Sequence, residues 1–486
     1  MKVLENNFKL NFKNNSFNFY NASDGIIPFI ISEILQNKKK IVIALSDNKY
    51  LKPFAKTLSA ITGINNILIF PSWDCFPYSD VSPSNYNINI RFKVLTEILF
   101  QKNDYKIIIT NFKNLTMLLP NKGEVISNIF YLEKNKEYNL KDTINTLSSR
   151  GYNHVNLVLE PNEYAIRGGI IDIWPVGEQA PVRLDFFGDT LESIKLFDPM
   201  SQISKKEKHS ISIFQNIEPP LSDTAKNDFI SNYRNYFGPS SNKDLFIHQL
   251  KEDKKLDGIE HWMPLFYKKK FISFFDFFNP EYLIFEHNLL NELEIFYKET
   301  IDAYSEKKEL ASTQIESINQ PIKPELLYLD QSLLSKQLNL IKKIEFNKFI
   351  SKKSNNYDLK ATDNIEKDIK VNSDEQLFRI LQNIVLKRTK KKIIFVADNE
   401  KNKEKLIFYI KNLFNNDEFI LRTNKSNFTE SFDDQEIVDI LIYPLDKGFE
   451  NSFIKIISFY EIFKVRKTIQ SRKYKNNINI SDINIY

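Results

Sequence analysis

The chain has 486 residues, 42% hydrophobic and 27% charged, and its 67 Lys and Arg against 62 Asp and Glu give a formal charge of +5. This length predicts about three domains, and so small and diffuse an excess of positive charge argues against a dedicated nucleic-acid groove. The lone cysteine, Cys75, excludes an intramolecular disulfide framework, and the five histidines form no ligand spacing with it, so no metal site is expected. With neither a signal peptide nor an apolar run of membrane-spanning length, a cytoplasmic protein without a membrane partner is expected.

Residues 1–118 alternate predicted helices and strands. The apolar periodicity predicts helices at 26–35, 50–61 and 90–99, and strands at 40–45, 66–70 and 105–110. Alternation of this kind is typical of βαβ units, in which helices cover a mostly parallel sheet. We therefore expect the first part of an α/β domain here.

A nucleotide-binding loop is missing from the place where such a sheet usually carries one. The chain has eleven glycines and none of them precedes a lysine, so no Gly-x-x-x-x-Gly-Lys-Ser/Thr segment exists. Residues 21–28 occupy that place, without the lysine that holds the β- and γ-phosphates. No cofactor, catalytic residue or ATP hydrolysis is expected in this chain.

Residues 119–205 are expected to form an inserted domain with a small antiparallel sheet. A helix is predicted at 141–149. Strands are predicted at 170–174, 182–187 and 191–197, with glycines in the turns between them. The period of two places Val182, Leu184 and Phe186 on one face of the second strand, and Arg183, Asp185 and Phe187 on the other.

The outer face of this sheet offers an arginine beside an aromatic ring, a pairing enriched in protein-binding hot spots. Arg183 and Phe187 share the strand face, and Arg167 lies nearby in the sequence. The alternative is structural: Arg167 and Arg183 could pair with Asp172 and Asp185 across the strands. The pattern alone favours neither partner binding nor ion pairing within the sheet.

The remaining chain continues the α/β domain and adds another. Residues 206–350 are expected to form its second part, with an aromatic-rich turn at 258–267 and a buried strand at 282–286. Residues 351–372 are polar and predict a linker, and 466–486 predict a basic tail. A small α/β domain is predicted over 373–465, with helices at 377–386 and 403–413 and strands at 392–397, 439–443 and 453–458.

Five segments in this order resemble the N-terminal, UvrB-like region of the bacterial transcription-repair coupling factor; they are residues 70–83, 162–175, 182–189, 258–266 and 444–450. The resemblance covers nearly the whole chain. It implies a degenerate, RecA-type motor-like domain split by an inserted UvrA-binding domain and followed by a third small domain.

The resemblance also implies a function and its residues. Arg167, Arg183 and Phe187 match positions that contact UvrA, the damage-recognition ATPase, in this family. The family continues into domains that bind RNA polymerase and run on double-stranded DNA with ATP and Mg²⁺, and the resemblance implies that these domains lie beyond this chain. The expected role is therefore UvrA recruitment, with the segment inactive as an enzyme by itself. Two alternatives stay open: a UvrB-type helicase, which would bind ATP at micromolar concentration, and a sequence-independent DNA-binding platform, whose association would depend strongly on salt.

Overall fold

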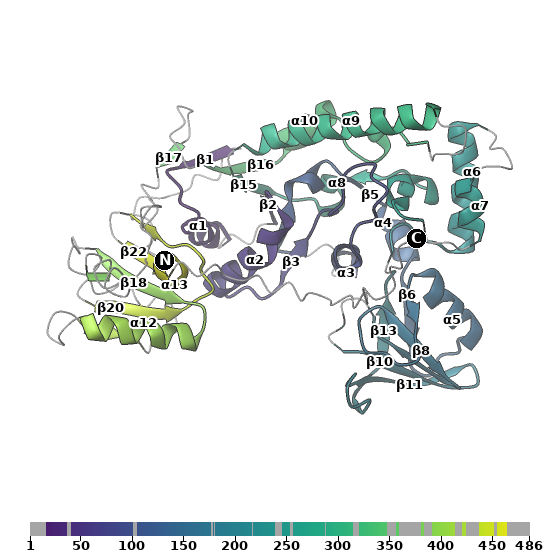
Figure 1. Ribbon diagram of the computed structural model, residues 1–486, viewed down its shortest axis with the longest axis horizontal. Helices are drawn as coiled ribbons and strands as arrows, with labels where there is room; N and C mark the ends of the chain where they lie inside the picture. The colour runs from purple at the N-terminus through teal and green to yellow at the C-terminus, as the bar shows by residue number, and fades with distance from the viewer. Residues whose placement is uncertain are drawn as a thin grey trace, which may run out of the picture. The chain divides into compact units, whose positions relative to one another are not determined.

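The computed structural model (Figure 1) describes residues 16–35, 40–100, 105–175, 178, 180–215, 217–238, 245–252, 256–286, 288–313, 320–347, 356–358, 381–382, 391–413, 420–423, 437–451 and 454–463. These residues fall into two compact units. One contains residues 16–19 and 34–357, and the other contains residues 20–33 and 358–463.

The larger unit is built on a sheet whose six main strands are parallel. The strand order is β17 (Asn356–Asp358), β1 (Ser16–Tyr20), β16 (Lys342–Phe346), β15 (Tyr282–Glu286), β2 (Ile41–Leu45), β4 (Ile107–Asn111) and β3 (Ile67–Phe70). All residues of β2 and β4 are buried, as expected for central strands covered on both faces. Because β15 pairs with β2, segments on either side of the inserted domain share one sheet, and the predicted split α/β fold is confirmed.

The helices of this unit begin and end at residues with the expected capping chemistry. Asp47 caps α2 (Asn48–Thr62) by accepting a hydrogen bond from the Lys49 amide, and Gly63 ends it in the left-handed conformation. The other helices are α3 (Asn85–Phe100), α4 (Lys122–Ser127), α6 (Asp223–Phe237), α7 (Leu245–Lys251), α8 (Phe274–Phe278), α9 (Leu289–Thr313) and α10 (Gln331–Leu340). Among the described helices, none is long and apolar enough to cross a membrane.

One segment differs from its prediction. The expected aromatic-rich turn is the 3₁₀ helix η3 (Ile259–Phe266), in which all residues except Pro264 are buried. Gly258 precedes it with a positive φ of 73°, and a Cβ there would lie 2.6 Å from the Ser79 carbonyl oxygen. The close approach of two backbones, which only glycine permits, therefore positions this helix against the loop that follows β3.

The inserted domain has a core of its own. Its six-stranded sheet has the order β12 (Ser204–Lys208), β11 (Thr190–Phe197), β10 (Val182–Phe187), β9 (Ile170–Ile173), β8 (Glu163–Arg167) and β7 (Asn153–His154). A separate pair joins β6 (Phe130–Glu133) to β13 (Ser210–Ile213), and α5 (Leu140–Ser149) completes the domain. The buried core cluster runs from Leu132 to Ile213 and includes Leu147 of α5, Ile171, Val182 and Leu184. The predicted antiparallel sheet is confirmed.

Excised residues 128–218 should therefore fold alone and unfold cooperatively on heating. A shorter fragment, 119–205, is the matched comparison, because it loses β13 and the buried side chains of Ile211 and Ile213. We expect its melting temperature to be lower by more than about 5 °C, or its transition to be lost. Differential scanning calorimetry measures both, and equal transitions would contradict a core that includes β13.

The smaller unit is a second α/β sheet. Its strand order is β19 (Ile420–Arg422), β20 (Ile437–Ile442), β18 (Lys392–Ala397), β22 (Ile454–Ser458) and β21 (Phe449–Glu450), with only β21 antiparallel. Its helices are α12 (Glu400–Leu413), α13 (Phe459–Phe463) and α1 (Ile27–Ile34), whose Phe29 ring lies 5.5 Å from that of Phe449. The predicted third α/β domain is confirmed. Most of the helix expected at 377–386, most of the linker and the whole tail lie outside the described residues.

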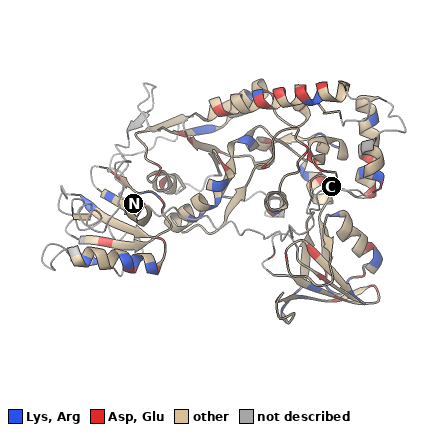
Figure 2. Cartoon of the chain, viewed as in Figure 1, with Lys and Arg blue, Asp and Glu red and all other residues tan. Residues whose placement is uncertain are grey.

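Charge is mixed on the long exposed helices. Figure 2 shows acidic and basic residues interspersed along α9. In α12, the acidic residues Glu400 and Glu404 stand among lysines of the same helix. Because double-stranded nucleic acid is bound through a surface of one sign, neither helix has the charge pattern of a phosphate-tracking surface.

Candidate partner-binding site

Strand β10 presents two different faces, as the sequence alternation predicts. Val182, Leu184 and Phe186 are buried, whereas Phe187 is 76% exposed. A β-bulge between Asp185 and Phe186 shifts the register with β11 but leaves this alternation intact. The buried face packs against α5, and the outer face carries the predicted partner-binding residues.

Arg183 forms the structural ion pair that the sequence left as an alternative. Its Nε and Nη2 lie 2.7 and 2.8 Å from the Asp172 carboxylate oxygens, across β10 and β9. Asp172 is only 2% exposed, and the Arg183 guanidinium lies 4.8 Å from the centre of the Phe197 ring. The hydrogen bonds that Arg183 donates to the Asp172 carboxylate raise the pKa of Arg183 above its usual value. Arg183 is thus a half-buried part of the sheet as well as part of its outer face.

Arg167 and Phe187 are more accessible than Arg183. Arg167 ends β8 as an exposed side chain, and its Nη2 donates a 3.3 Å hydrogen bond to the Asn156 carbonyl oxygen. The alternative pairing of Arg167 with Asp172 or Asp185 is not found among the described residues. Phe187 ends β10, and because β9 lies between β8 and β10, Arg167 and Phe187 lie at the same end of the sheet.

Gly169 connects these two strand ends. The Phe186 amide donates a 2.8 Å hydrogen bond to the Gly169 carbonyl oxygen. A Cβ at position 169 would lie 2.5 Å from the Phe186 carbonyl oxygen, closer than real Cβ atoms approach. Glycine is therefore required here for backbone approach, and that approach fixes the position of the strand end that carries Phe187.

Two loops add apolar side chains that the sequence interpretation missed. The loop that offers its Asn156 carbonyl to Arg167 exposes Leu157 and Leu159. The loop that offers its Gln202 carbonyl to Arg183, at 3.3 Å, exposes Met200 and Ile203. Their apolar character in otherwise polar loops could have indicated these residues in the sequence. Only the folded sheet, however, shows that the two loops flank the arginines. The outer-face surface is defined by Arg167, Arg183, Phe187, Leu157, Leu159, Met200 and Ile203.

The surface has the makeup of a protein interface. Exposed rings and aliphatic side chains supply area to bury, and arginines held by a rigid sheet supply oriented donors. Among the residues that the structure describes, no three His, Cys, Asp or Glu side chains gather as metal ligands.

Comparison with known proteins places this domain in a family. The model described as the UvrB interaction domain matches residues 130–218. A solved structure of an XPD helicase aligns with 88% of the chain at 10% identity, with a TM-score of 0.22, which is too low to support an argument about fold.

The curated relatives extend over most of the chain. The transcription-repair-coupling factor of Haemophilus influenzae is 28% identical over 67% of the chain and 28% of the relative. Those of Rickettsia conorii and Borreliella burgdorferi are 25% and 28% identical over 92% and 90% of the chain. The chain spans at most about two fifths of these relatives' length, 39% and 37% for the last two. The resemblance inferred from the sequence is confirmed: the chain is a homologue of the transcription-repair-coupling factors and contains a UvrB interaction domain.

Proposed function

We propose that this chain recruits UvrA through the outer-face surface of its inserted domain, and so links RNA polymerase stalled at DNA damage to nucleotide excision repair. The single observation that carries the proposal is Phe187, an aromatic ring exposed on a rigid strand end beside Arg167, inside a UvrB interaction domain. A large exposed ring on an ordered strand costs little entropy to bury. The connection to polymerase and double-stranded DNA is proposed from the relatives' role in transcription-repair coupling.

The three candidate residues should contribute differently. Phe187 and Arg167 are free to contact a partner without loss to the fold, since the ring is exposed and the guanidinium holds one long hydrogen bond. Removing Arg183 would leave the buried Asp172 carboxylate without its counter-ion. Substitution of Phe187 or Arg167 should therefore weaken binding without loss of stability, whereas substitution of Arg183 should weaken both.

Replacing Phe187 by alanine should weaken UvrA binding by about 2 kcal/mol or more, roughly thirtyfold, with the melting temperature unchanged. Arg167→Ala should weaken binding in the same direction, and Arg183→Ala should lower both affinity and melting temperature. Phe76, 78% exposed on a loop outside the inserted domain, provides the matched control. Titration of labelled UvrA by fluorescence anisotropy, with a melting curve for each variant, measures both quantities.

Phe76→Ala should bind UvrA like the unmodified chain. If Phe187→Ala and Arg167→Ala also bind with unaltered affinity, the outer-face surface does not recruit UvrA. A Phe187→Ala variant that loses stability rather than affinity would assign the ring a structural role instead.

A further inference from the structure

The turn that joins β11 to β12, residues 198–203, exposes an aliphatic side chain that no part of the fold buries. Met200 in this turn is 87% exposed, the highest value among the large hydrophobic side chains that the structure describes. The other described methionines, Met117 and Met263, are 3% and 1% exposed, as expected for core residues. Ile203 at the end of the turn is 64% exposed, so the turn presents two apolar side chains to solvent.

Hydrogen bonds within the turn hold its backbone in place. The Asp198 carboxylate accepts from the amides of Met200 and Ser201, both at 3.0 Å, and from Lys205 Nζ at 2.9 Å. The Asp198 amide donates to the Ile203 carbonyl oxygen at 3.0 Å and so closes the turn. Because the backbone around Met200 is already ordered, burying this side chain costs little more than its own rotamer entropy.

The turn adjoins one of the arginines of the outer-face surface. Arg183 Nη1 donates to the Gln202 carbonyl oxygen at 3.3 Å, and its guanidinium lies 4.8 Å from the centre of the Phe197 ring, in the residue that precedes the turn. Phe197 is 1% exposed and packs in a small cluster with Val158 and Ala165, which anchors the base of the turn on the sheet. A partner that contacts Arg183 therefore comes close to the turn as well.

The turn and Phe187 lie at opposite ends of the β10–β11 hairpin. Phe187 pairs with Thr190 at one end, whereas the Phe197 amide donates to the Pro181 carbonyl oxygen at the other. Along β10, a rise of about 3.3 Å per residue separates the two ends by roughly 17 Å. A contact at Phe187 alone would therefore leave the turn in solvent.

Single exposed hydrophobic residues are common on protein surfaces, so exposure alone does not make Met200 a contact residue. Three further observations set it apart: Ile203 is exposed in the same turn, hydrogen bonds hold the backbone, and the turn adjoins Arg183. The turn also lies inside residues 130–218, which match the UvrB interaction domain. An apolar side chain near an oriented arginine is the composition of an interface hot spot.

We propose that Met200 is a second anchor for UvrA and inserts, together with Ile203, into an apolar pocket of that partner. Because UvrA is the partner of the proposed function, this role of Met200 rests on that function. Methionine suits the role, since its unbranched thioether adapts to irregular apolar pockets. The receiving pocket is aliphatic or aromatic rather than charged, because the thioether sulfur is only a weak hydrogen-bond acceptor.

Titration of labelled UvrA with variants of Met200 tests the proposal. Met200→Gln replaces the thioether by a polar amide of similar length and should weaken binding roughly tenfold or more, because the amide is not favourably buried in an apolar pocket. Met200→Leu keeps the apolar volume and should bind within about threefold of the unmodified chain. Leu340→Gln, at an 82% exposed position of α10 outside the inserted domain, is the matched control and should change nothing. Both positions are exposed, so no variant should shift the melting temperature.

Combining Met200→Gln with Phe187→Ala separates the second anchor from the proposed function. Because the two ends of the hairpin are far apart, the tenfold and thirtyfold losses should multiply to roughly three-hundredfold in the double variant. If Phe187→Ala weakens binding and Met200→Gln does not, the second anchor is refuted while the proposed function stands. If neither variant weakens binding, both are refuted.

A second copy of the chain is the competing occupant of the turn. Sedimentation velocity over a series of concentrations distinguishes the two. A chain that stays monomeric agrees with UvrA as the occupant. A dimer that Met200→Gln dissociates would assign the turn to self-association and overturn the proposal.

Discussion

Replacing Glu218 by alanine should lower the free energy of unfolding of the larger unit by about 3–5 kcal/mol, because it leaves a buried arginine without an anion. Arg91 is 1% exposed, and its Nε lies 3.4 Å from Glu218 Oε1. The Trp73 indole also donates to Glu218 Oε2 at 2.7 Å, so the variant removes a second buried partner. The other acceptors of Arg91 are neutral: the Pro71 carbonyl at 2.9 Å, the Asn114 side chain at 2.8 Å and the Met117 sulfur at 3.3 Å.

Urea denaturation followed by tryptophan fluorescence measures this effect cleanly. The chain has three tryptophans, Trp73, Trp174 and Trp262, and all lie in the larger unit. Glu218→Gln keeps an acceptor for the indole but removes the charge, so its loss of stability should be smaller. Glu294→Ala, an exposed acid on α9, should change the transition by less than about 0.5 kcal/mol. A loss below about 1 kcal/mol for Glu218→Ala would show that the ion pair is not a stabilising element.

An Asp439→Ala variant should destabilise the smaller unit by a similar amount, about 3–5 kcal/mol. Asp439 is fully buried on β20, where its carboxylate accepts from Arg422 Nε at 2.6 Å and Nη2 at 2.8 Å and lies 3.0 Å from Lys392 Nζ. Lys392 is 3% exposed, so the variant removes the Asp439 carboxylate from beside a buried ammonium group.

The readout differs from that of Glu218→Ala. The smaller unit contains no tryptophan, so the destabilisation should appear in the far-ultraviolet circular dichroism while the tryptophan transition stays in place. A tryptophan transition that moves as far as the dichroism would contradict two separate cores.

The contribution of Asp439 should also depend on pH. Burial raises the pKa of Asp439, but the hydrogen bonds from Arg422 and Lys392 outweigh burial, and the pKa lies below its usual value. A lowered pKa stabilises the fold above the unfolded pKa of about 4, and this stability is lost as the pH falls through the folded pKa. The difference between the unmodified chain and Asp439→Asn should therefore shrink below about pH 4.

Features that depend on local pattern could be predicted from the sequence. The apolar runs at 41–45 and 107–109 indicate strands buried on both faces, and the alternation at 182–187 assigns each side chain to a face. By contrast, β12 has no apolar residue, since its sequence is Ser-Lys-Lys-Glu-Lys and only pairing with β11 makes it a strand.

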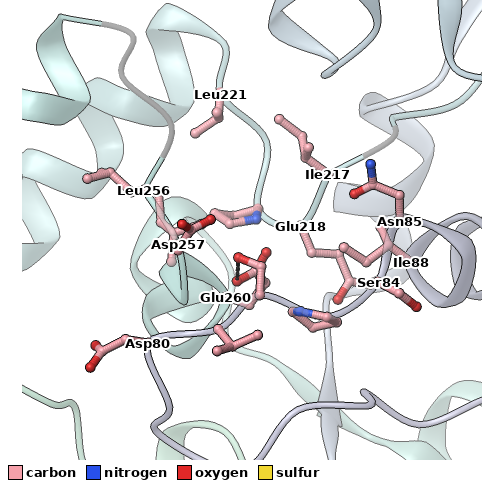
Figure 3. Close-up of a pocket in the computed structure, with 15 residues that line it drawn as sticks. Asp80, Ser84, Asn85, Ile88, Ile217, Glu218, Leu221, Leu256, Asp257 and Glu260 are labelled. Carbon is pink, nitrogen blue, oxygen red and sulfur yellow. Dashed lines mark hydrogen bonds between the residues drawn. The ribbon is translucent and has the colours of Figure 1, made fainter. Parts of the chain in front are cut away.

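Features that depend on long-range contact could not be predicted. The sequence offered Arg183 either of two acidic partners, and only the register of β9 against β10 assigns Asp172 to it. Arg91 and Glu218 are 127 residues apart, and no periodicity links them. A cavity of about 400 Å³ in the larger unit (Figure 3) is likewise lined by three distant segments, 80–88, 217–221 and 256–260, so its shape has no local signature.

The backbone contact at Gly169 makes partner recognition sensitive to a position that no partner need touch. A side chain at 169 would push against the Phe186 carbonyl and turn the end of β10, so the ring of Phe187 would point elsewhere with its chemistry unchanged. Under the proposed function, two homologues with the same arginines and the same ring could then differ in their choice of partner through one methyl group. The choice of partner at this surface would then depend on main-chain geometry as well as on the side chains that touch the partner.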